Sequence, residues 1–300
     1  VCKPDCILAT NTSYLDVDEI ADATARPEQV VGAHFFSPAN VMKLLEVVRA
    51  KKTAPHVVQT FMKLARKIGK IPVAVGVCHG FVGNRMLKGY GRQASLLLLE
   101  GATPAQVDDT MQSWGMAMGP LAVGDLAGLD IGYRSRRDQG IESRSGKEFE
   151  LADTLVEMER LGQKTGAGYY RYDPETRKRE SDPEVESLIE SIAQRWEVER
   201  RNIDSEEIVD RLVLALVNEG AAIVREGIAA RPSDVDIVYL NGYGFPNWRG
   251  GPMFHADTLG LDTTIAKLES LRKLTGDDCW QPDPLLLELA EKGQTLASLN

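Results

Sequence analysis

The chain has 300 residues, of which 43% are hydrophobic and 26% charged, a composition typical of globular proteins rather than disordered or fibrous ones. Its length predicts two domains, or three if some of them are small. The net charge of −9 argues against a nucleic-acid partner, which would need a basic surface, and no apolar run reaches the length of a membrane span.

The N-terminal part alternates short apolar runs of strand type with helical patterns. The expected elements are, in chain order, a strand at 6–10, a helix at 16–24, strands at 30–36 and 41–48, a helix at 54–68 and a strand at 71–75. This alternation predicts a mainly parallel sheet covered by helices, with antiparallel pairing of the second and third strands as an alternative. Asn11 and Ser13 directly follow the first strand, and ligands of such sheets bind at the carboxyl ends of strands.

Two polar residues lie inside the second and third apolar runs, namely His34 and Glu46. A histidine in an apolar strand is most often a hydrogen-bonded core residue, but a carboxylate in such a run is rare unless it is paired. If the two strands are neighbours, Glu46 can accept the proton of one ring nitrogen and leave the other nitrogen free as a base. The sequence therefore predicts a proton-transfer pair.

A glycine-rich phosphate turn of the pattern G-x-G-x-x-G, placed between a strand and a helix, is not found. Gly166–Gly168 runs into Tyr169 and suits a turn before a strand, whereas the glycines at 242–251 are interrupted by Pro246 and Trp248. Either this part binds no dinucleotide, or the sequence begins after the first half of such a domain. In the second case we expect open sheet edges.

From about Gly80 the pattern is helical, and residues 84–101 resemble residues 210–227. Arg211 follows Arg85 by 126 residues, and the later Gly-Pro and Gly-Leu-Asp motifs recur after 132 residues. A duplicated helical unit explains this repeat, because the six extra residues fall in turns. The copies differ at Asn84, which is Asp210 in the second copy, so that one copy can form a site and the other a support.

The segment between the copies is charged. The four cysteines of the chain are spread over its whole length. We expect Arg134–Glu150 to be a solvated loop and Lys164 to lie in a tight turn, where a surface lysine is the plainest interpretation. So few cysteines favour a reducing compartment, and Cys2 and Cys6 have no second pair at metal-ligand spacing, so no metal site is expected.

Five ordered motifs resemble those of the L-3-hydroxyacyl-CoA dehydrogenases. They are N-T-S from Asn11, G-A-H-F-F-S-P from Gly32, M-K-L-L-E-V from Met42, H-G-F-V-G-N-R from His79 and G-Q-K-T-G-A-G-Y-Y from Gly162. The second helical copy, with N-G-Y-G-F-P-N-W-R-G-G-P-M-F from Asn241, resembles the multifunctional fatty-acid β-oxidation enzymes. Those enzymes carry a crotonase-type enoyl-CoA hydratase domain upstream.

The resemblance implies an α/β plus all-α chain. An incomplete Rossmann-type sheet, the second half of an NAD-binding domain, would occupy residues 1–76. Two duplicated helical domains would follow, at 77–190 (of substrate-binding and dimerisation type) and at 191–300. The implied cofactor is NAD, the substrate an acyl-CoA, and the implied partners in the full-length chain are the upstream Rossmann half and a hydratase domain.

The resemblance also implies the site residues. The catalytic set is His34, Glu46, Asn84 and Ser13, and the cofactor-binding set is Ser13, Asn11 and Lys164. His34 would take the proton of the 3-hydroxyl group while a hydride leaves C3, and Glu46 would orient the imidazole and stabilise its charged form. Asn84 would contact the substrate, Ser13 would lie between cofactor and substrate, and Lys164 would approach the cofactor.

The sequence lacks one motif of the family, and other kinds of protein also fit its pattern. Without the glycine-rich turn, the chain alone is expected to bind NAD weakly or not at all. A lambda-crystallin-like structural protein and a helical assembly module are alternatives to an enzyme. Related dehydrogenases use a lysine base, but the spacing of His34 and Glu46 favours the acyl-CoA type. The C-terminus lacks an S-K-L address, which favours a bacterial cytoplasm, with a peroxisome as the alternative.

Overall fold

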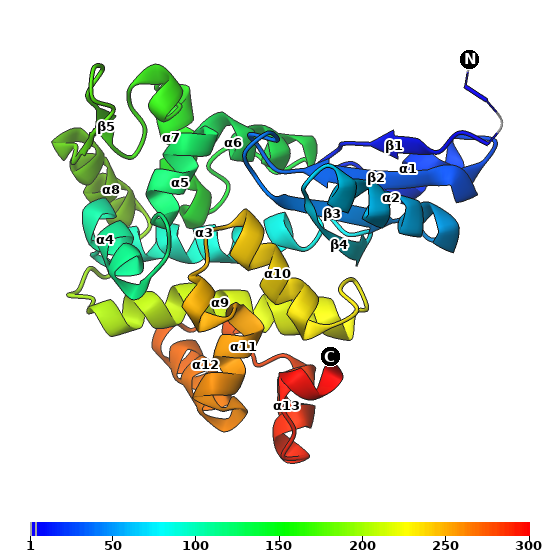
Figure 1. Ribbon diagram of the computed structural model, residues 1–300. Helices are drawn as coiled ribbons and strands as arrows, with labels where there is room; N and C mark the ends of the chain where they lie inside the picture. Colours follow the sequence, from blue (N-terminus) through cyan, green and yellow to red (C-terminus); the bar gives the residue numbers. More distant parts are fainter. Residues whose placement is uncertain (1, 4) are drawn as a thin grey trace. The chain divides into compact units, whose positions relative to one another are not determined.

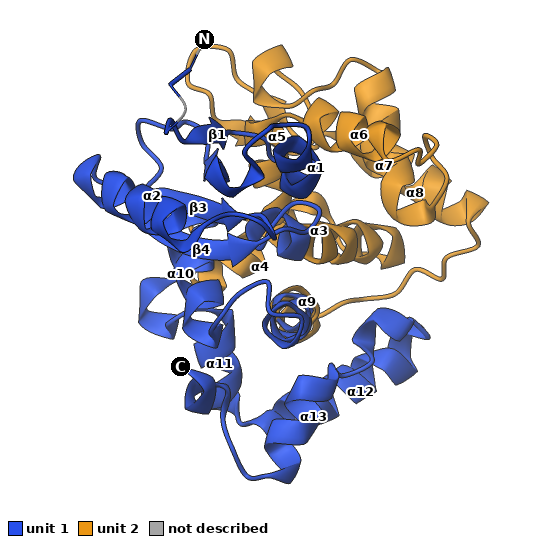
Figure 2. Cartoon of the chain, turned by 90° about the vertical axis from the view of Figure 1, so that its right-hand side faces the viewer, with its two compact units in different colours: residues 1–87, 214–300 blue, residues 88–213 orange. Residues whose placement is uncertain are grey.

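The computed structural model describes residues 2–3 and 5–300, whose elements are drawn in Figure 1. The chain divides into two compact units, coloured separately in Figure 2. Residues 1–87 and 214–300 form the first, here called the sheet unit, and residues 88–213 form the second, the helical unit. The boundaries fall inside the two longest helices, α3 (Gly83–Glu100) and α9 (Ser205–Arg225).

The sheet unit contains a four-stranded sheet with the order β1-β2-β3-β4. Its strands are β1 (Leu8–Thr10), β2 (Val30–Phe35), β3 (Leu44–Arg49) and β4 (Ile71–Gly76). The pairs β1–β2 and β3–β4 are parallel, whereas β2 and β3 are antiparallel. The expected strands are therefore confirmed, and of the two pairings left open for the second and third strands, the antiparallel one is correct.

The remaining elements of the sheet unit are helical. The α-helices are α1 (Val17–Asp22), α2 (Pro55–Lys67), α10 (Pro232–Gly242), α11 (Pro252–Leu259), α12 (Leu261–Thr275) and α13 (Pro284–Glu291). Short 3-10 turns are η1 (Pro27–Gln29), η3 (Asn247–Arg249), η4 (Asp278–Trp280) and η5 (Leu296–Leu299). Many of these helices start at a proline, whose missing N–H costs nothing in a first turn.

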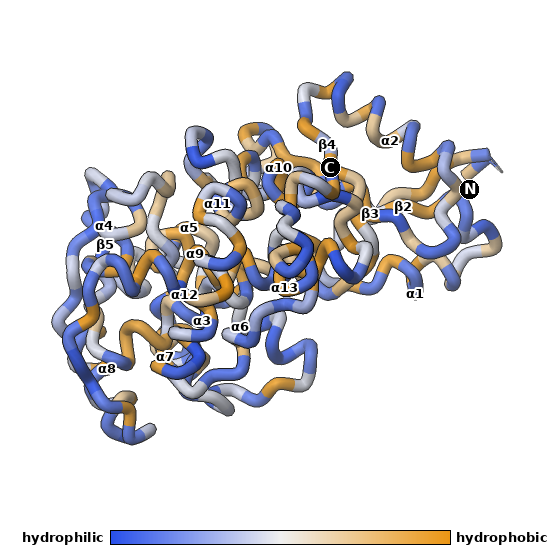
Figure 3. The backbone as a smooth tube through the Cα atoms, turned by 90° about the horizontal axis from the view of Figure 1, so that it is seen from below, coloured by the Kyte–Doolittle hydropathy of each residue, from blue (hydrophilic) through white to orange (hydrophobic). Residues whose placement is uncertain are grey.

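The two faces of the sheet have different roles because side chains alternate along a strand. One face carries Val31 and Ala33 of β2 and Val47 of β3, which form a buried cluster with Val57 and Ala65 of α2. Helix α2 is amphipathic, and its trace in Figure 3 changes repeatedly between hydrophilic and hydrophobic colours. The opposite face is therefore the one that carries the even-numbered residues of β2 and β3, including the two polar ones.

The helical unit holds the middle of the chain. Its elements are α4 (Pro104–Trp114), α5 (Pro120–Ala127), α6 (Leu129–Asp138), α7 (Lys147–Glu157), η2 (Gln163–Thr165), β5 (Arg171–Tyr172), β6 (Arg179–Glu180) and α8 (Pro183–Arg195). The solvated loop expected over Arg134–Glu150 is wrong at both ends, which α6 and α7 occupy, and holds only for residues 139–146 between them. There Arg136 pairs with Asp153 and lies 4.9 Å from the ring of Phe149, so the arginine supports packing rather than a loop.

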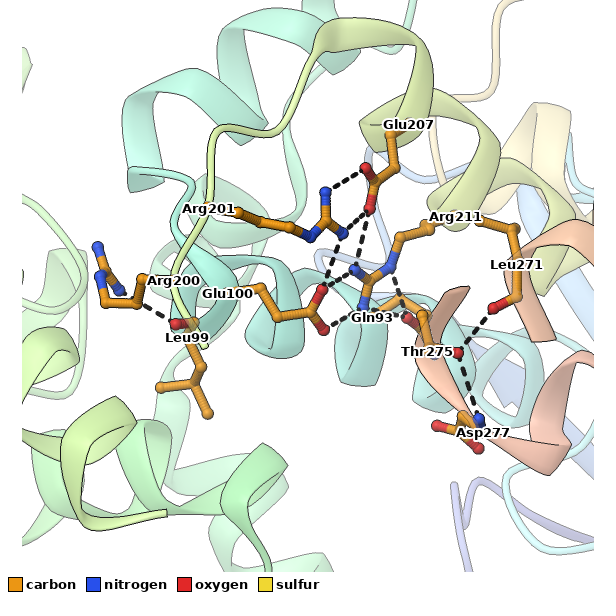
Figure 4. Close-up of polar contacts among 10 residues, drawn as sticks. All are labelled: Gln93, Leu99, Glu100, Arg200, Arg201, Glu207, Arg211, Leu271, Thr275 and Asp277. Carbon is orange, nitrogen blue, oxygen red and sulfur yellow. Dashed lines mark hydrogen bonds and ion pairs between the residues drawn. The ribbon is translucent and has the colours of Figure 1, made fainter. Parts of the chain in front are cut away.

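A buried ion cluster joins the ends of α3 and α9 inside the helical unit (Figure 4). Arg211 is fully buried, and its guanidinium donates to Gln93 Oε1 at 2.9 and 3.1 Å and to both Glu100 oxygens at 2.5 and 2.9 Å. Arg201 bridges Glu100 and Glu207 beside it. A guanidinium without access to water needs such a full set of acceptors, because burying an unpaired charge is very costly.

A buried carboxylate of the sheet unit gives a testable pH dependence. Burial raises the pKa of Asp236 to about 7, and the nearby Asp257 adds to this, although the N–H groups of Met253 and Phe254 oppose it. Between the ordinary pKa of 3.8 and about 7, the folded state thus binds more protons than the unfolded state. The contribution of Asp236 to the free energy of unfolding is therefore expected to fall as the pH rises through this window.

The variant Asp236→Asn keeps an oxygen for the two N–H groups but cannot titrate. We expect the difference in free energy of unfolding between variant and parent to change in favour of the variant from pH 4 to pH 7, as measured by urea unfolding at several pH values. Asp262→Asn, at an exposed position of α12, is the control for replacing an aspartate at the surface. A pH-independent difference for Asp236→Asn would contradict the prediction.

Candidate active site

His34 and Glu46 face each other across the antiparallel strands β2 and β3. The register pairs the two residues directly, and His34 Nδ1 lies 2.7 Å from Glu46 Oε2. Directly opposed residues of antiparallel strands have neighbouring side chains on one face of the sheet, which is why the pair forms here. Both side chains are buried, with 4% of His34 and none of Glu46 exposed. The predicted pairing of these two residues is confirmed at the level of geometry.

The second oxygen of Glu46 is also used. Glu46 Oε1 accepts the backbone N–H of Gly83 at 3.0 Å, and Gly83 is the first residue of α3. The amino end of a helix has unsatisfied N–H groups and a partial positive charge, so it stabilises a carboxylate. Glu46 therefore links the imidazole on the sheet to the start of α3, where Asn84 is the next residue.

The free ring nitrogen of His34 lies among aromatic side chains. The imidazole is 4.7 Å from the ring of Phe36 and 5.4 Å from that of Phe81, measured between ring centroids. Within residues 2–3 and 5–300, no hydrogen-bond partner is recorded for Nε2. With Nδ1 held by a carboxylate, Nε2 is the nitrogen that can accept or deliver a proton.

Asn84 has a partner that the sequence did not single out. The hydroxyl of Tyr243 donates to Asn84 Oδ1 at 2.8 Å, and Tyr243 directly follows α10. Neither spacing of the repeat, 126 or 132 residues, relates Tyr243 to Asn84, which lie 159 residues apart. Asn84 and Tyr243 both belong to the sheet unit, together with His34 and Glu46.

Asn11 and Ser13 lie in the turn that follows β1. Asn11 Oδ1 accepts the N–H of Phe35, which ties this turn to the end of β2, one residue from His34. The hydroxyl of Thr12 accepts the N–H groups of the two residues that follow Ser13. The turn thus uses its own backbone donors, and for Ser13 no hydrogen bond is recorded within the described part of the chain.

Lys164 lies in the helical unit and not in the sheet unit that holds the other five predicted residues. Its ammonium group forms an ion pair with Asp130 at the start of α6, and this hydrogen bond lowers the pKa of Asp130 below its ordinary value. The lysine is partly exposed, with 46% of its side chain accessible. The tight turn expected around it is confirmed, with Gly162 and Gly166 at positive φ on either side.

Metal sites and membrane-spanning helices are both absent from the described residues. No group of three or more His, Cys, Asp or Glu side chains in residues 2–3 and 5–300 could hold a metal ion. Among the helices formed by the same residues, none combines the length and the apolar character needed to cross a membrane.

A buried imidazole–carboxylate pair that is also bonded to a helix start is an arrangement able to transfer a proton, and here it lies on a sheet of an α/β fold. Residues 1–78 match the family profile described as 3-hydroxyacyl-CoA dehydrogenase, NAD binding domain. Residues 80–172 and 208–297 match the one described as 3-hydroxyacyl-CoA dehydrogenase, C-terminal domain. The chain belongs to the 3-hydroxyacyl-CoA dehydrogenase family, which confirms the resemblance drawn from its motifs.

Relatives with long matches include both eukaryotic and bacterial proteins. The human peroxisomal bifunctional enzyme is 46% identical over 98% of this chain and 42% of its own length. The fatty acid oxidation complex subunit alpha of Psychrobacter arcticus is 36% identical over 98% of this chain and 41% of its own length. The chain thus spans less than half the length of these relatives.

A solved structure supports the fold. The dehydrogenase part of multifunctional enzyme 1 from C. elegans is 33% identical and superposes with a TM-score of 0.71, over 96% of this chain and 65% of that one. The expected mixed α/β architecture with a Rossmann-like sheet followed by many helices is therefore confirmed.

Proposed function

We propose that the chain carries the proton-transfer part of an enzyme that oxidises L-3-hydroxyacyl-CoA to 3-ketoacyl-CoA with NAD. The observation that carries this proposal is the contact of His34 Nδ1 with Glu46 Oε2, together with the bond from Glu46 Oε1 to the start of α3. A base of fixed orientation needs both contacts, because the first holds the imidazole and the second holds the carboxylate. The match to two domains of one dehydrogenase family supports the same reaction.

The proposed roles follow from the chemistry of each side chain. His34 Nε2 takes the proton of the substrate 3-hydroxyl group during oxidation and returns it during reduction. Glu46 keeps the proton on Nδ1 and stabilises the imidazolium through its negative charge. Asn84, at the start of α3, contacts the substrate. When bound, NAD supplies the acceptor for the hydride that leaves C3.

The described residues fit one end of NAD better than the other. Ser13 and the amide nitrogen of Asn11 supply polar groups beside the carboxyl ends of β1 and β2, and we propose that they face the reactive end of the cofactor. The turn after β1 does not suit a pyrophosphate, because Thr12 occupies its N–H groups. A glycine-rich turn would have to come from residues outside this sequence.

We infer that the chain has domains at 1–76, 77–190 and 191–300, and that the last two, which are helical, arose by duplication. Two reciprocal arginine clusters support this. Arg85 pairs with Glu219 on α9 and with Glu226 directly after it at 2.5–3.0 Å, as Arg211 pairs with Gln93 and Glu100 on α3. The matched positions, each 126 residues apart, are Arg85 and Arg211, Gln93 and Glu219, and Glu100 and Glu226.

Two buried aspartates support the same inference. Asp108 accepts the first N–H groups of α5, and Asp236 accepts those of α11. The two aspartates are 128 residues apart and the helices they cap are 132 residues apart. The two ranges that match the C-terminal-domain profile, 80–172 and 208–297, fall one in each proposed copy and support the same proposal.

The named relatives bear on the remaining proposals. We propose an upstream Rossmann half and a hydratase domain in the full-length chain, since the relatives are more than twice as long and include a bifunctional enzyme. For the compartment, a peroxisome is supported by the human relative and a bacterial cytoplasm by the Psychrobacter one. The enzyme names of these relatives favour catalysis over the lambda-crystallin-like alternative.

The test is turnover of NADH with acetoacetyl-CoA, followed at 340 nm. The chain alone is expected to give little turnover, because the phosphate turn is missing. A chimera in which the corresponding upstream residues of the human relative precede Val1 should turn over robustly. An inactive chimera that is folded and binds NADH would contradict the proposed function, and robust turnover by the chain alone would contradict the need for the upstream half.

A further inference from the structure

The hydroxyl of Tyr243 is aimed at the side-chain amide of Asn84. Its oxygen lies 2.8 Å from Asn84 Oδ1, across 159 residues of sequence and within the sheet unit. An asparagine amide has an acceptor oxygen on one side and an NH2 donor on the other. A donor that bonds to the oxygen therefore leaves the NH2 group on the other side, free to donate.

The ring of Tyr243 is held by its surroundings. It stacks on Tyr239 with centroids 4.8 Å apart and meets Phe36 edge-on at 5.5 Å. It also occupies the space where a side chain of Gly83 would lie, since a Cβ on that glycine would be 2.4 Å from Tyr243 Cε2. A ring enclosed on these sides has little freedom to move its hydroxyl away from Asn84.

The hydroxyl acts as a donor in this contact. Burial, and next the charge of Glu46, raise the pKa of Tyr243 well above its ordinary value, so the phenol keeps its proton. With the amide turned the other way, that proton would have no acceptor recorded in the described part of the chain, which is costly for a buried group. Oδ1 of Asn84 therefore faces Tyr243.

We propose that Tyr243 is a positioning residue, which fixes the amide of Asn84 so that its NH2 group faces the substrate and donates to a carbonyl oxygen of the acyl-CoA. Within the described residues, Asn84 Nδ2 has no recorded partner and is available for this bond. The inference rests on the proposed function, because it assigns a donor to that site. It also gives the second helical copy, to which Tyr243 belongs, a direct part in substrate recognition.

The test uses Tyr243→Phe in the chimera described above, with NADH and acetoacetyl-CoA. Loss of one hydrogen bond of this kind is expected to lower kcat/KM about tenfold. Tyr90→Phe is the matched control, since it removes a buried tyrosine hydroxyl on α3 that has no recorded hydrogen-bond partner among the described residues, and it should change kcat/KM less than twofold. Calorimetry provides a second readout: Tyr243→Phe should weaken binding of acetoacetyl-CoA but not of coenzyme A alone.

A double-variant cycle separates positioning from a structural effect. In the Asn84→Ala background, Tyr243→Phe should cause no further loss, because the hydroxyl would then have nothing to orient. An equal tenfold loss in both backgrounds, or no loss in either, would overturn the inference. If the parent chimera is active and Tyr243→Phe turns over as fast as the parent, the proposed function stands and this inference alone is wrong. A parent chimera that is folded and binds NADH but is inactive overturns the proposed function and the inference with it.

Discussion

Replacing His34 with glutamine is expected to lower kcat of the chimera by about 10²–10⁴-fold, with little change in KM for acetoacetyl-CoA. Glutamine is close to histidine in length and can still bond to Glu46, but it cannot take up a proton. The loss should therefore appear in the chemical step, which single-turnover oxidation of NADH measures directly.

The control for this experiment is His56→Gln. His56 is exposed on α2, on the face of the sheet opposite to His34, and its replacement should leave kcat unchanged. If His34→Gln left kcat unchanged as well, the site would not be a proton-transfer site, and the lambda-crystallin-like structural alternative would be favoured instead.

Replacing Arg211 with methionine is expected to reduce the free energy of unfolding by about 3 kcal/mol. The guanidinium is fully buried, and its removal takes two hydrogen bonds from Gln93 Oε1 and leaves Glu100 with the more distant Arg201. Breaking a buried ion pair costs much more than forming it contributes, because the remaining charge cannot return to water. Urea unfolding measures the change.

Arg272→Met is the matched control for Arg211→Met. Arg272 pairs with Asp278 at an exposed position, where loss of an ion pair costs about 1 kcal/mol or less. Replacing Gln93 and Glu100 with leucine together with Arg211→Met should recover much of the lost stability, since no buried polar group would then lack a partner. A loss from Arg211→Met no larger than that of the control would show that the cluster contributes little.

The sequence predicted the four-stranded sheet and its flanking helices well, because the residues that start and end these elements are local signals. Pro55 marks the start of α2 and Gly76 the end of β4, each within about one residue of the expected position. The direction of β2 against β3 stayed open, because alternation of side chains is the same in parallel and antiparallel strands. The charged stretch from Arg134 was misjudged, since charge counts do not reveal that an arginine can lie along an aromatic ring.

The contacts that complete the candidate site are the least local ones. His34 and Glu46 are twelve residues apart and their pairing followed from two neighbouring strands. Tyr243 reaches Asn84 across 159 residues, and no periodic pattern carries that information. The buried caps made by Asp108 and Asp236 escaped notice for the same reason, because each depends on where another helix begins.

The antiparallel register also determines which changes of length the site tolerates. Shifting β3 by one residue against β2 would turn Glu46 to the face covered by α2 and leave His34 beside an aliphatic side chain. Residues added at the tip between the strands, near the exposed Ala39 and Asn40, would leave that opposition intact. Insertions at this bend should therefore be tolerated. A single deletion within either strand should abolish proton transfer, even when it removes neither His34 nor Glu46.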